Sequence, residues 1–276
     1  AMAERMTEKL LDKYGYNTKV PILELHAQND VDLQYLADFV YEKVFLHYTM
    51  KQWGMKPDEV GGKAMARIPV YVSTDDRYFQ NPYQGVPAYG YTAMMEKMIS
   101  KKNIVTLTGL DYQDVISLDE KAKKVLVNGQ EFDGKVIFTA CIDKLMDYKF
   151  GNLPYRSLKF EFTTLDKEEY QPVATVNYPC NYEFTRITEF KKLTMQKHPK
   201  TTIMKEFSTL YNPDDDRLDP LYPIPQKENE ELYDKYLNSV KEYPQIVLAG
   251  RLANYKYFTM AETIRNALDI VKSELL

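Results

Sequence analysis

The sequence lacks the features of a membrane protein, a disulfide-linked protein and a metalloprotein. No apolar run approaches the roughly 18 residues of a membrane span, and residues 1–20 lack the continuous apolar centre of a signal peptide. The two cysteines, Cys141 and Cys180, lie far apart, and the three histidines are isolated, so none has metal-ligand spacing. We therefore expect no membrane span, no disulfide and no metal site, and we place the protein in the cytoplasm.

An excess of positive charge is also missing. The net charge is -4 and the isoelectric point lies near 5.6, which argues against nucleic acid as the main partner because a phosphate-backbone binder usually carries a basic domain. The unusual abundance is 23 tyrosines. A phenol can stack on a base or sugar and can hydrogen-bond a phosphate, although packing at the margins of strands and helices explains most of them.

The sequence also lacks the glycine-rich turn that binds a dinucleotide, since its 11 glycines nowhere form the pattern G-x-G-x-x-G. Residues 245–251 nevertheless predict a buried strand, and Thr259 with Glu262 forms a T-x-x-E capping box before a helix. Together they make half of a βαβ unit. Because the chain also opens inside a helical pattern with no preceding strand, we expect the partner strands to lie upstream of residue 1.

The pattern of elements changes along the chain from helical to antiparallel. Asn29 or Asp30 can cap a helix that runs to about residue 47. Short strands begin at residue 104, and Asn128-Gly129 predicts a two-residue hairpin. Between about 157 and 208, strands follow one another without a helical crossover, which favours an antiparallel sheet. The expected strands cover residues 104–109, 115–119, 124–132, 134–140, 157–165, 172–178, 184–190 and 201–208, and a helix is expected over 227–243.

An ordered series of motifs carries a resemblance to a known family. The motifs YTMKQWGM (48–55), RIPV (67–70), DDRYF (75–79) and QGVPAYGYTAMMEKMI (84–99) resemble, in order and spacing, the substrate-domain signature of UDP-galactopyranose mutases. The resemblance continues through residues 132–162, 181–190, 204–208, 221–225 and 249–260. It spans about residue 30 to the end, and such ordered agreement is far more specific than any single motif.

The resemblance implies a chemistry that a cofactor carries. In that family reduced FAD attacks the anomeric carbon of UDP-galactopyranose and displaces UDP, and the sugar recloses as the furanose, UDP-galactofuranose, which supplies lipopolysaccharide and other surface polysaccharides. The protein positions the substrate and neutralises the leaving diphosphate. We therefore expect UDP-galactose or UDP as the ligand, and FAD as the cofactor of the intact parent protein.

The resemblance also implies a fold class, α+β, derived from an α/β parent. It comprises a small helical region, an antiparallel β-sheet substrate domain and remnants of a Rossmann-like FAD-binding domain. The expected parts are a helical substrate-binding region at 1–62, a connecting segment at 63–102, remnant FAD-domain strands at 103–150, the antiparallel substrate domain at 151–235 and a strand and helix that return to the FAD-binding domain at 236–276.

Roles for individual residues follow from the same resemblance. Tyr48, Trp53 and Tyr78 match the uridine end of the substrate site. Arg186 matches an arginine that lies close to the flavin and the diphosphate, so we count it among the substrate-binding residues. Taken from the sequence alone, Trp53 suits base stacking or packing between regions equally well.

The diphosphate and cofactor residues come from later motifs. Arg67, Tyr222 and Tyr257 match the residues that bind the diphosphate, and we expect them to be catalytic because they can follow the phosphate oxygens as UDP departs. The resemblance assigns the flavin side to three residues near the C-terminus, which are Arg251, Thr259 and Met260.

The departures from the family pattern leave two hypotheses open. Phe207-Ser208-Thr209 stands where the family has Y-S-R, so one diphosphate-contacting arginine is missing. Ala253, Asn254 and Thr259 replace a glycine, a threonine and an aspartate near the flavin.

The leading hypothesis is a fragment of a flavin-dependent mutase that, alone, binds no FAD and is inactive. The alternative is a non-catalytic UDP-sugar-binding homologue. A third class, a flavin amine-oxidase-like enzyme, fits the split architecture but not the uridine-side motifs. We also expect a homo-oligomer, through strand edges exposed at 136–140 and 246–249.

Overall fold

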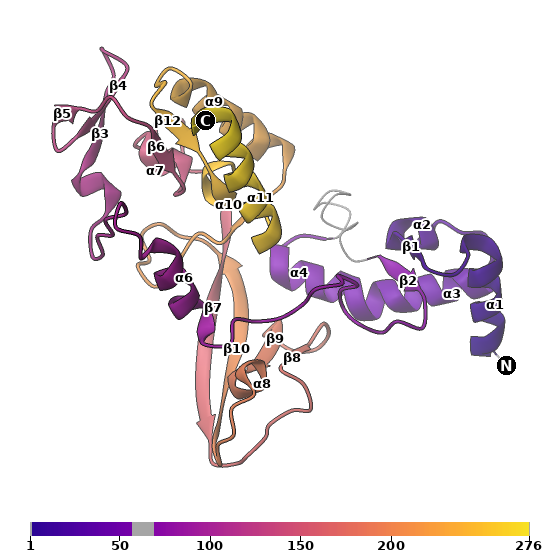
Figure 1. Cartoon of the computed structure of the whole chain (residues 1–276). Helices are drawn as coiled ribbons and strands as arrows, with labels where there is room; N and C mark the ends of the chain where they lie inside the picture. The colour runs from indigo at the N-terminus through magenta and orange to yellow at the C-terminus, as the bar shows by residue number, and fades with distance from the viewer. Residues whose placement is uncertain (1, 57–68, 276) are drawn as a thin grey trace. The chain divides into compact units, whose positions relative to one another are not determined.

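The protein divides into two compact units. The computed structural model describes residues 2–56 and 69–275 (Figure 1). Unit 1 comprises Ala1–Ser100 and Lys159–Thr209, and unit 2 comprises Lys101–Leu158 and Leu210–Leu276. Within the described ranges, no helix has the length and apolar character needed to cross a membrane, and no cluster of histidine, cysteine and acidic side chains is arranged to hold a metal ion.

Unit 1 opens with a helical region around a small apolar core of Val20, Leu25, Ala37 and Val72. Asp30 caps the third helix by accepting hydrogen bonds from the backbone N–H groups of Asp32 and Leu33, as the sequence predicts. The helical path expected to end near residue 47 continues to Trp53 and stops at Gly54, whose φ of 70° is left-handed. The elements are α1 (Met2–Tyr14), β1 (Thr18–Val20), α2 (Ile22–His26), α3 (Val31–Val40), the π-helical turn η1 (Tyr41–Leu46) and α4 (His47–Trp53).

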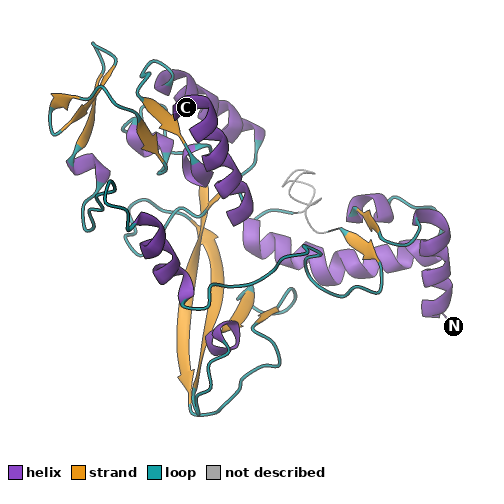
Figure 2. Cartoon of the chain, in the orientation of Figure 1, coloured by secondary structure: helices purple, strands orange, loops and turns teal. Residues whose placement is uncertain are grey.

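The rest of unit 1 contains most of an antiparallel sheet (Figure 2). β9 pairs antiparallel with both β8 and β10, which confirms the predicted arrangement. Glu189 in β9 is fully buried, and its carboxylate accepts hydrogen bonds from the N–H groups of Tyr170 and Gln171 and from the Thr201 hydroxyl. The elements are β2 (Val70–Val72), which pairs with β1, α6 (Gly90–Ile99), β7 (Tyr155–Leu165), β8 (Thr175–Asn177), β9 (Arg186–Glu189), α8 (Phe190–Thr194) and β10 (Thr201–Leu210). Residues 155–158 of β7 and Leu210 of β10 belong to unit 2.

Unit 2 is built around a core rich in tyrosine, in which Tyr155, Tyr236 and Tyr243 are almost completely buried. The expected hairpin forms, with φ of 50° at Asn128 and 74° at Gly129. The elements are η2 (Tyr112–Asp114), β3 (Ile116–Asp119), β4 (Lys124–Val127), β5 (Gln130–Glu131), β6 (Val136–Phe138), α7 (Ile142–Leu145), β11 (Tyr222–Pro223), α9 (Lys227–Val240), β12 (Ile246–Leu248), α10 (Gly250–Ala253), α11 (Met260–Ile270) and η3 (Val271–Leu275).

Two strand predictions in unit 2 have different outcomes. The strand expected at 104–109 is wrong, because this described segment is a loop in which Val105 and Leu107 are 85% and 72% exposed. Alternating apolar residues make a strand only where a partner buries one face. In contrast, the strand expected at 245–251 forms as β12 and pairs in parallel with β6, with Val247 opposite Ile137. The expectation that its partners lie upstream of residue 1 is therefore wrong for this partner, which belongs to the same chain. The mixture of helices and antiparallel strands agrees with the expected α+β class, and the Rossmann-like origin of the parallel pair stays a prediction.

Candidate functional site

The first group of site residues lies in unit 1, where α4 faces strands β9 and β10. Nη2 of Arg186 donates a hydrogen bond of 2.7 Å to the hydroxyl of Tyr48, and Nε of Arg186 lies 3.3 Å from a carboxylate oxygen of Glu206. Burial raises the pKa of the Tyr48 phenol, and the nearby Arg186 cation opposes this shift. Burial also raises the pKa of Glu206, again against the effect of Arg186.

This arrangement fixes the direction of hydrogen bonding at Tyr48. A guanidinium has no acceptor, so the Tyr48 oxygen must accept the bond from Arg186. The hydroxyl therefore keeps its own proton for donation to another acceptor. Trp53 ends the same helix and is half-buried. The structure thus brings Tyr48 and Arg186 together, and a contact of Arg186 with flavin or diphosphate stays a prediction.

A hollow of about 400 Å³ lies beside Tyr78, also in unit 1. Tyr78 is 62% exposed, and its ring meets Phe79 edge to face at 4.7 Å. The residues lining the hollow are mostly polar or aromatic. They are Lys19, Pro69, Tyr71, Asp75, Asp76, Arg77, Tyr78, Phe79, Gln80, Asn81 and Pro82.

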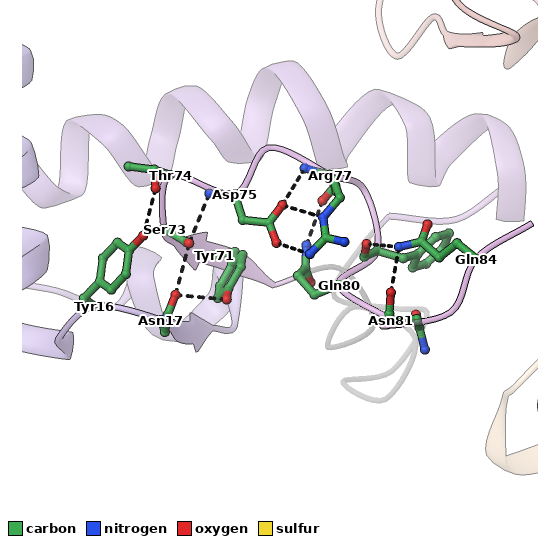
Figure 3. Close-up of polar contacts among 11 residues, drawn as sticks. Tyr16, Asn17, Tyr71, Ser73, Thr74, Asp75, Arg77, Gln80, Asn81 and Gln84 are labelled. Atoms are coloured by element: carbon green, nitrogen blue, oxygen red, sulfur yellow. Dashed lines mark hydrogen bonds and ion pairs between the residues drawn. The ribbon is translucent and has the colours of Figure 1, made fainter.

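A network of polar contacts holds the walls of this hollow (Figure 3). The side-chain oxygen of Asn17 accepts hydrogen bonds of 3.1 Å from the Tyr71 and Ser73 hydroxyls. The Arg77 guanidinium binds both carboxylate oxygens of Asp75, at 2.9 and 2.7 Å, and holds the pKa of Asp75 at about 2. The family motif identified Tyr78 as a site residue but did not identify Asn17, Asp75 and Arg77. The adjacent pair Asp75-Asp76 before Arg77 is the signal that would have drawn attention to them.

The second group lies in unit 2 and centres on Arg251. The rings of Tyr222 and Tyr257 stack with centroids 5.7 Å apart and planes 9° apart. Cζ of Arg251 lies 5.2 Å from the Tyr222 centroid and 4.5 Å from the Tyr257 centroid, within the range of a cation–π interaction. The guanidinium also donates to two backbone carbonyls, those of Phe258 (2.6 and 3.1 Å) and Leu221 (3.0 Å). Arg251 therefore joins the two segments that carry the tyrosines.

Thr259 and Met260 begin α11. Thr259 forms the predicted capping box, because its hydroxyl accepts from the N–H of Glu262 and its own N–H donates to the Glu262 carboxylate. Met260 is 68% exposed and starts an exposed apolar face that continues with Ile264 and Leu268. A contact of these residues with flavin stays a prediction.

The remaining predicted positions have simple local roles or lie outside the described residues. Arg67 lies outside the described residues. Thr209 is half-buried near the end of β10. Ala253 is fully buried, and the amide of Asn254 donates to the carbonyl of Gly250 at 2.9 Å, closing the short helix α10.

Unit 2 contains a second hollow, of about 590 Å³, that the sequence analysis did not predict. Asp143 lies in its wall and is buried, and its carboxylate accepts hydrogen bonds from the N–H groups of Leu153 and Lys144. Burial raises the pKa of Asp143 and raises the pKa of the Cys141 thiol to about 12. Cys141 lies three residues after the end of β6 and caps α7, which contains Asp143. A position just after a buried strand could have suggested a site.

Comparison with known proteins identifies the class of this fold. The chain aligns with the crystal structure of a reduced UDP-galactopyranose mutase with a TM-score of 0.55 and 14% identity, over 93% of this chain and 67% of that one. It therefore has the fold of a sugar-nucleotide mutase.

The sequence identifies the family. Residues 43–257 match the family model of UDP-galactopyranose mutase, and the chain belongs to that family. It is 31% identical to dTDP-fucopyranose mutase of Escherichia coli over 98% of this chain and 68% of that protein. It is 33% identical to a "Probable UDP-galactopyranose mutase" of Klebsiella pneumoniae over 90% and 60%, and 30% identical to UDP-galactopyranose mutase of Mycoplasma genitalium over 96% and 65%. The chain thus spans 60 to 68% of the length of these relatives.

Replacing Arg251 by Met tests the arrangement in unit 2. We expect a loss of about 1.5 to 3 kcal/mol in the free energy of unfolding of this unit, the range for hydrogen bonds to a charged group, together with a change in near-ultraviolet circular dichroism as Tyr222 and Tyr257 lose their cation. Urea denaturation measures the first quantity. Arg217→Met is the matched control, because Arg217 is an exposed arginine that pairs with Asp215. Equal stability of the two variants would contradict the bridging role of Arg251.

Proposed function

We propose that this chain is the sugar-nucleotide-binding portion of a flavin-dependent UDP-galactopyranose mutase, which converts UDP-galactopyranose into UDP-galactofuranose for surface polysaccharides. The observation that carries the proposal is the Tyr48 hydroxyl, held by Arg186 so that it can donate to a ligand, within a motif of the mutase family. We place the protein in the cytoplasm, where a sugar-nucleotide substrate is made.

The two groups of residues suit different parts of the sugar nucleotide. The hollow beside Tyr78 carries two carboxylates, Asp75 and Asp76, and two cations, Lys19 and Arg77, so it has no excess of positive charge to attract a diphosphate, and its polar groups can form hydrogen bonds with a neutral nucleoside. Tyr48 and Trp53 add a hydroxyl donor and an aromatic face for the base. In unit 2, the phenols of Tyr222 and Tyr257 and the cation of Arg251 suit a diphosphate. The resemblance also assigns Arg67, which lies outside the described residues, to diphosphate binding.

The fit of this chain to FAD differs between the two ends of the cofactor. Reduced FAD supplies the nucleophile of the ring contraction when it is bound. The turn from β12 into α10 does not fit the pyrophosphate, because the N–H of Gly250 donates to the Asn266 side chain at 2.9 Å and the helix has only four residues. The resemblance assigns Thr259 and Met260 to the isoalloxazine end. We infer that the chain by itself does not hold FAD.

A non-catalytic sugar-nucleotide-binding protein is the second candidate. Thr209 favours it, because a threonine stands where the family has an arginine that contacts the diphosphate. A neutral hydroxyl gives a weaker hydrogen bond to phosphate than a guanidinium fork gives. The nucleotide of the substrate could be UDP or dTDP, since one relative is named a dTDP-fucopyranose mutase.

Titration with nucleotides tests the proposed binding. UDP should quench or shift the fluorescence of Trp53, the only tryptophan, and dTDP and uridine should be compared in the same assay. Tyr48→Phe should weaken UDP by about 0.5 to 1.5 kcal/mol, the value of one hydrogen bond, and Arg67→Ala should weaken UDP more than uridine by about 1.5 to 3 kcal/mol. An unchanged signal at millimolar UDP, dTDP and uridine would reject a nucleotide site.

The cofactor inference has its own test. The purified chain should be colourless, and the addition of FAD with dithionite should yield no UDP-galactofuranose by chromatography, because a few contacts at one end hardly offset the entropy of ordering so long a cofactor. A yellow preparation with stoichiometric flavin would refute the inference. Turnover after a flavin-binding segment is supplied upstream of residue 1 would then separate the mutase from the non-catalytic candidate.

Self-association is the third expectation. Among the described residues β6 and β12 form a two-stranded parallel sheet, and Ile137 in β6 is exposed. Open strand edges are templates for pairing with another chain. Light scattering from micromolar to millimolar concentration should therefore show association, which Ile137→Lys should weaken and Asn238→Lys, on the exposed side of α9, should not. A strict monomer over this range would contradict the prediction.

A further inference from the structure

One face of α4 is attached to the segments around β9 at three successive positions. Tyr48, Lys51 and Gln52 lie three and four residues apart and therefore share a side of the helix. The Tyr48 hydroxyl accepts a hydrogen bond from Arg186, and the Ser208 hydroxyl donates to the backbone carbonyl of Gln52 at 2.8 Å. Between them, Nζ of Lys51 reaches backbone carbonyls of the segment that connects β8 to β9.

Lys51 binds this segment through three hydrogen bonds. An ammonium group has three protons and no acceptor, and Nζ of Lys51 binds three carbonyls, those of Tyr178, Tyr182 (3.1 Å) and Phe184 (3.1 Å). Lys51 is half-buried, and this burial lowers the pKa of its ammonium group. Hydrogen bonds of a charged donor are stronger than neutral ones, so the three carbonyls and the helix are held as one piece.

The segment that Lys51 binds is irregular and aromatic. Asn181 has a φ of 29°, an uncommon conformation for a residue other than glycine. The rings of Tyr178 and Tyr182 meet at 4.8 Å, and those of Tyr178 and Phe184 at 4.9 Å. These rings pack against one another, but rings alone do not fix the direction of the carbonyls. The Lys51 ammonium supplies that direction.

A closed ring of contacts then links Lys51 to Tyr48. Lys51 binds the carbonyl of Phe184, and Arg186, two residues further along, donates to Tyr48. The backbone of α4 closes the ring between Tyr48 and Lys51. A change in the position of residue 184 therefore moves the guanidinium that orients the Tyr48 hydroxyl.

We propose that Lys51 is a positioning residue for nucleotide binding, which locks the segment 178–184 onto α4 and thereby orients Tyr48. Trp53 ends the same helix and reports on this lock. The inference rests on the proposed function for its link to a nucleotide. The positioning itself is a property of the ligand-free chain.

Two substitutions at Lys51 test this. Lys51→Met keeps the apolar stem but removes the ammonium, and it should weaken UDP binding about tenfold, measured by titration calorimetry, which corresponds to about 1.4 kcal/mol. Lys51→Arg keeps the positive charge but presents its donors in a planar fork, so it should recover part of the affinity that Lys51→Met loses. Without any ligand, iodide quenching of Trp53 should be greater in Lys51→Met than in the wild type and in Lys51→Arg.

Three further variants distinguish positioning from general destabilisation. Lys197→Met removes an exposed lysine of unit 1 and should change neither readout. Leu25→Ala opens a cavity in the helical core and should lower the melting temperature while leaving UDP affinity within about twofold. Ser208→Ala removes the hydroxyl that donates to the backbone carbonyl of Gln52 and should give a smaller change of the same kind, which keeps the test available if Lys51→Met does not fold.

The outcomes separate this inference from the proposed function. A wild-type chain that binds no UDP rejects the proposed function, and greater quenching of Trp53 in Lys51→Met would still support the positioning role. Wild-type UDP affinity and unchanged quenching in Lys51→Met overturn the inference. It is also overturned if Lys51→Arg fails to rescue, or if Leu25→Ala loses as much UDP affinity as Lys51→Met at an equal loss in melting temperature.

Discussion

A cation that leaves bulk water must replace its hydration with oxygen atoms or aromatic faces, and this constraint organises both groups of site residues. Arg186 satisfies it with the Tyr48 hydroxyl and the Glu206 carboxylate. Arg251 satisfies it with the carbonyls of Leu221 and Phe258 and with two tyrosine rings. Because a guanidinium is planar and its donors diverge, each arginine fixes the direction of the groups around it. Arg186 therefore orients Tyr48, and Arg251 orients Tyr222 and Tyr257, the tyrosines proposed to contact the ligand.

Features that depend on a few neighbouring residues could be predicted from the sequence. Asp30 caps α3, Thr259 and Glu262 form the capping box of α11, and Asn128-Gly129 closes the hairpin. In each case the bond lies within four residues of the signal, so local sequence determines it. The antiparallel strands could be predicted for a similar reason, since turn residues between short apolar runs leave no room for a helical crossover.

Features that depend on distant partners could not be predicted in the same way. Arg186 and Tyr48 lie 138 residues apart, and no spacing rule links them. The prediction for 104–109 failed because alternation does not reveal whether a second strand covers the apolar face. Resemblance named Arg251 as a flavin neighbour but did not reveal that backbone carbonyls and tyrosine rings surround its guanidinium. A motif identifies which residues matter, whereas the tertiary structure decides what each one contacts.

The distribution of charge bears on the choice between a mutase and a non-catalytic binder. The hollow beside Tyr78 has Asp75 neutralised by Arg77, so it presents polar groups with little field to attract a phosphate. Thr209 stands where the mutase family has an arginine, and under the proposed function a cation at this position would stabilise the departing UDP, which gains negative charge, more than the bound substrate. The loss of such a cation weakens binding and also raises the barrier from the bound complex. A phenol can shorten its hydrogen bond as negative charge grows on the phosphate oxygens. Thr209 therefore counts toward the non-catalytic candidate, whereas the proposed diphosphate role of the stacked Tyr222 and Tyr257 counts toward the mutase.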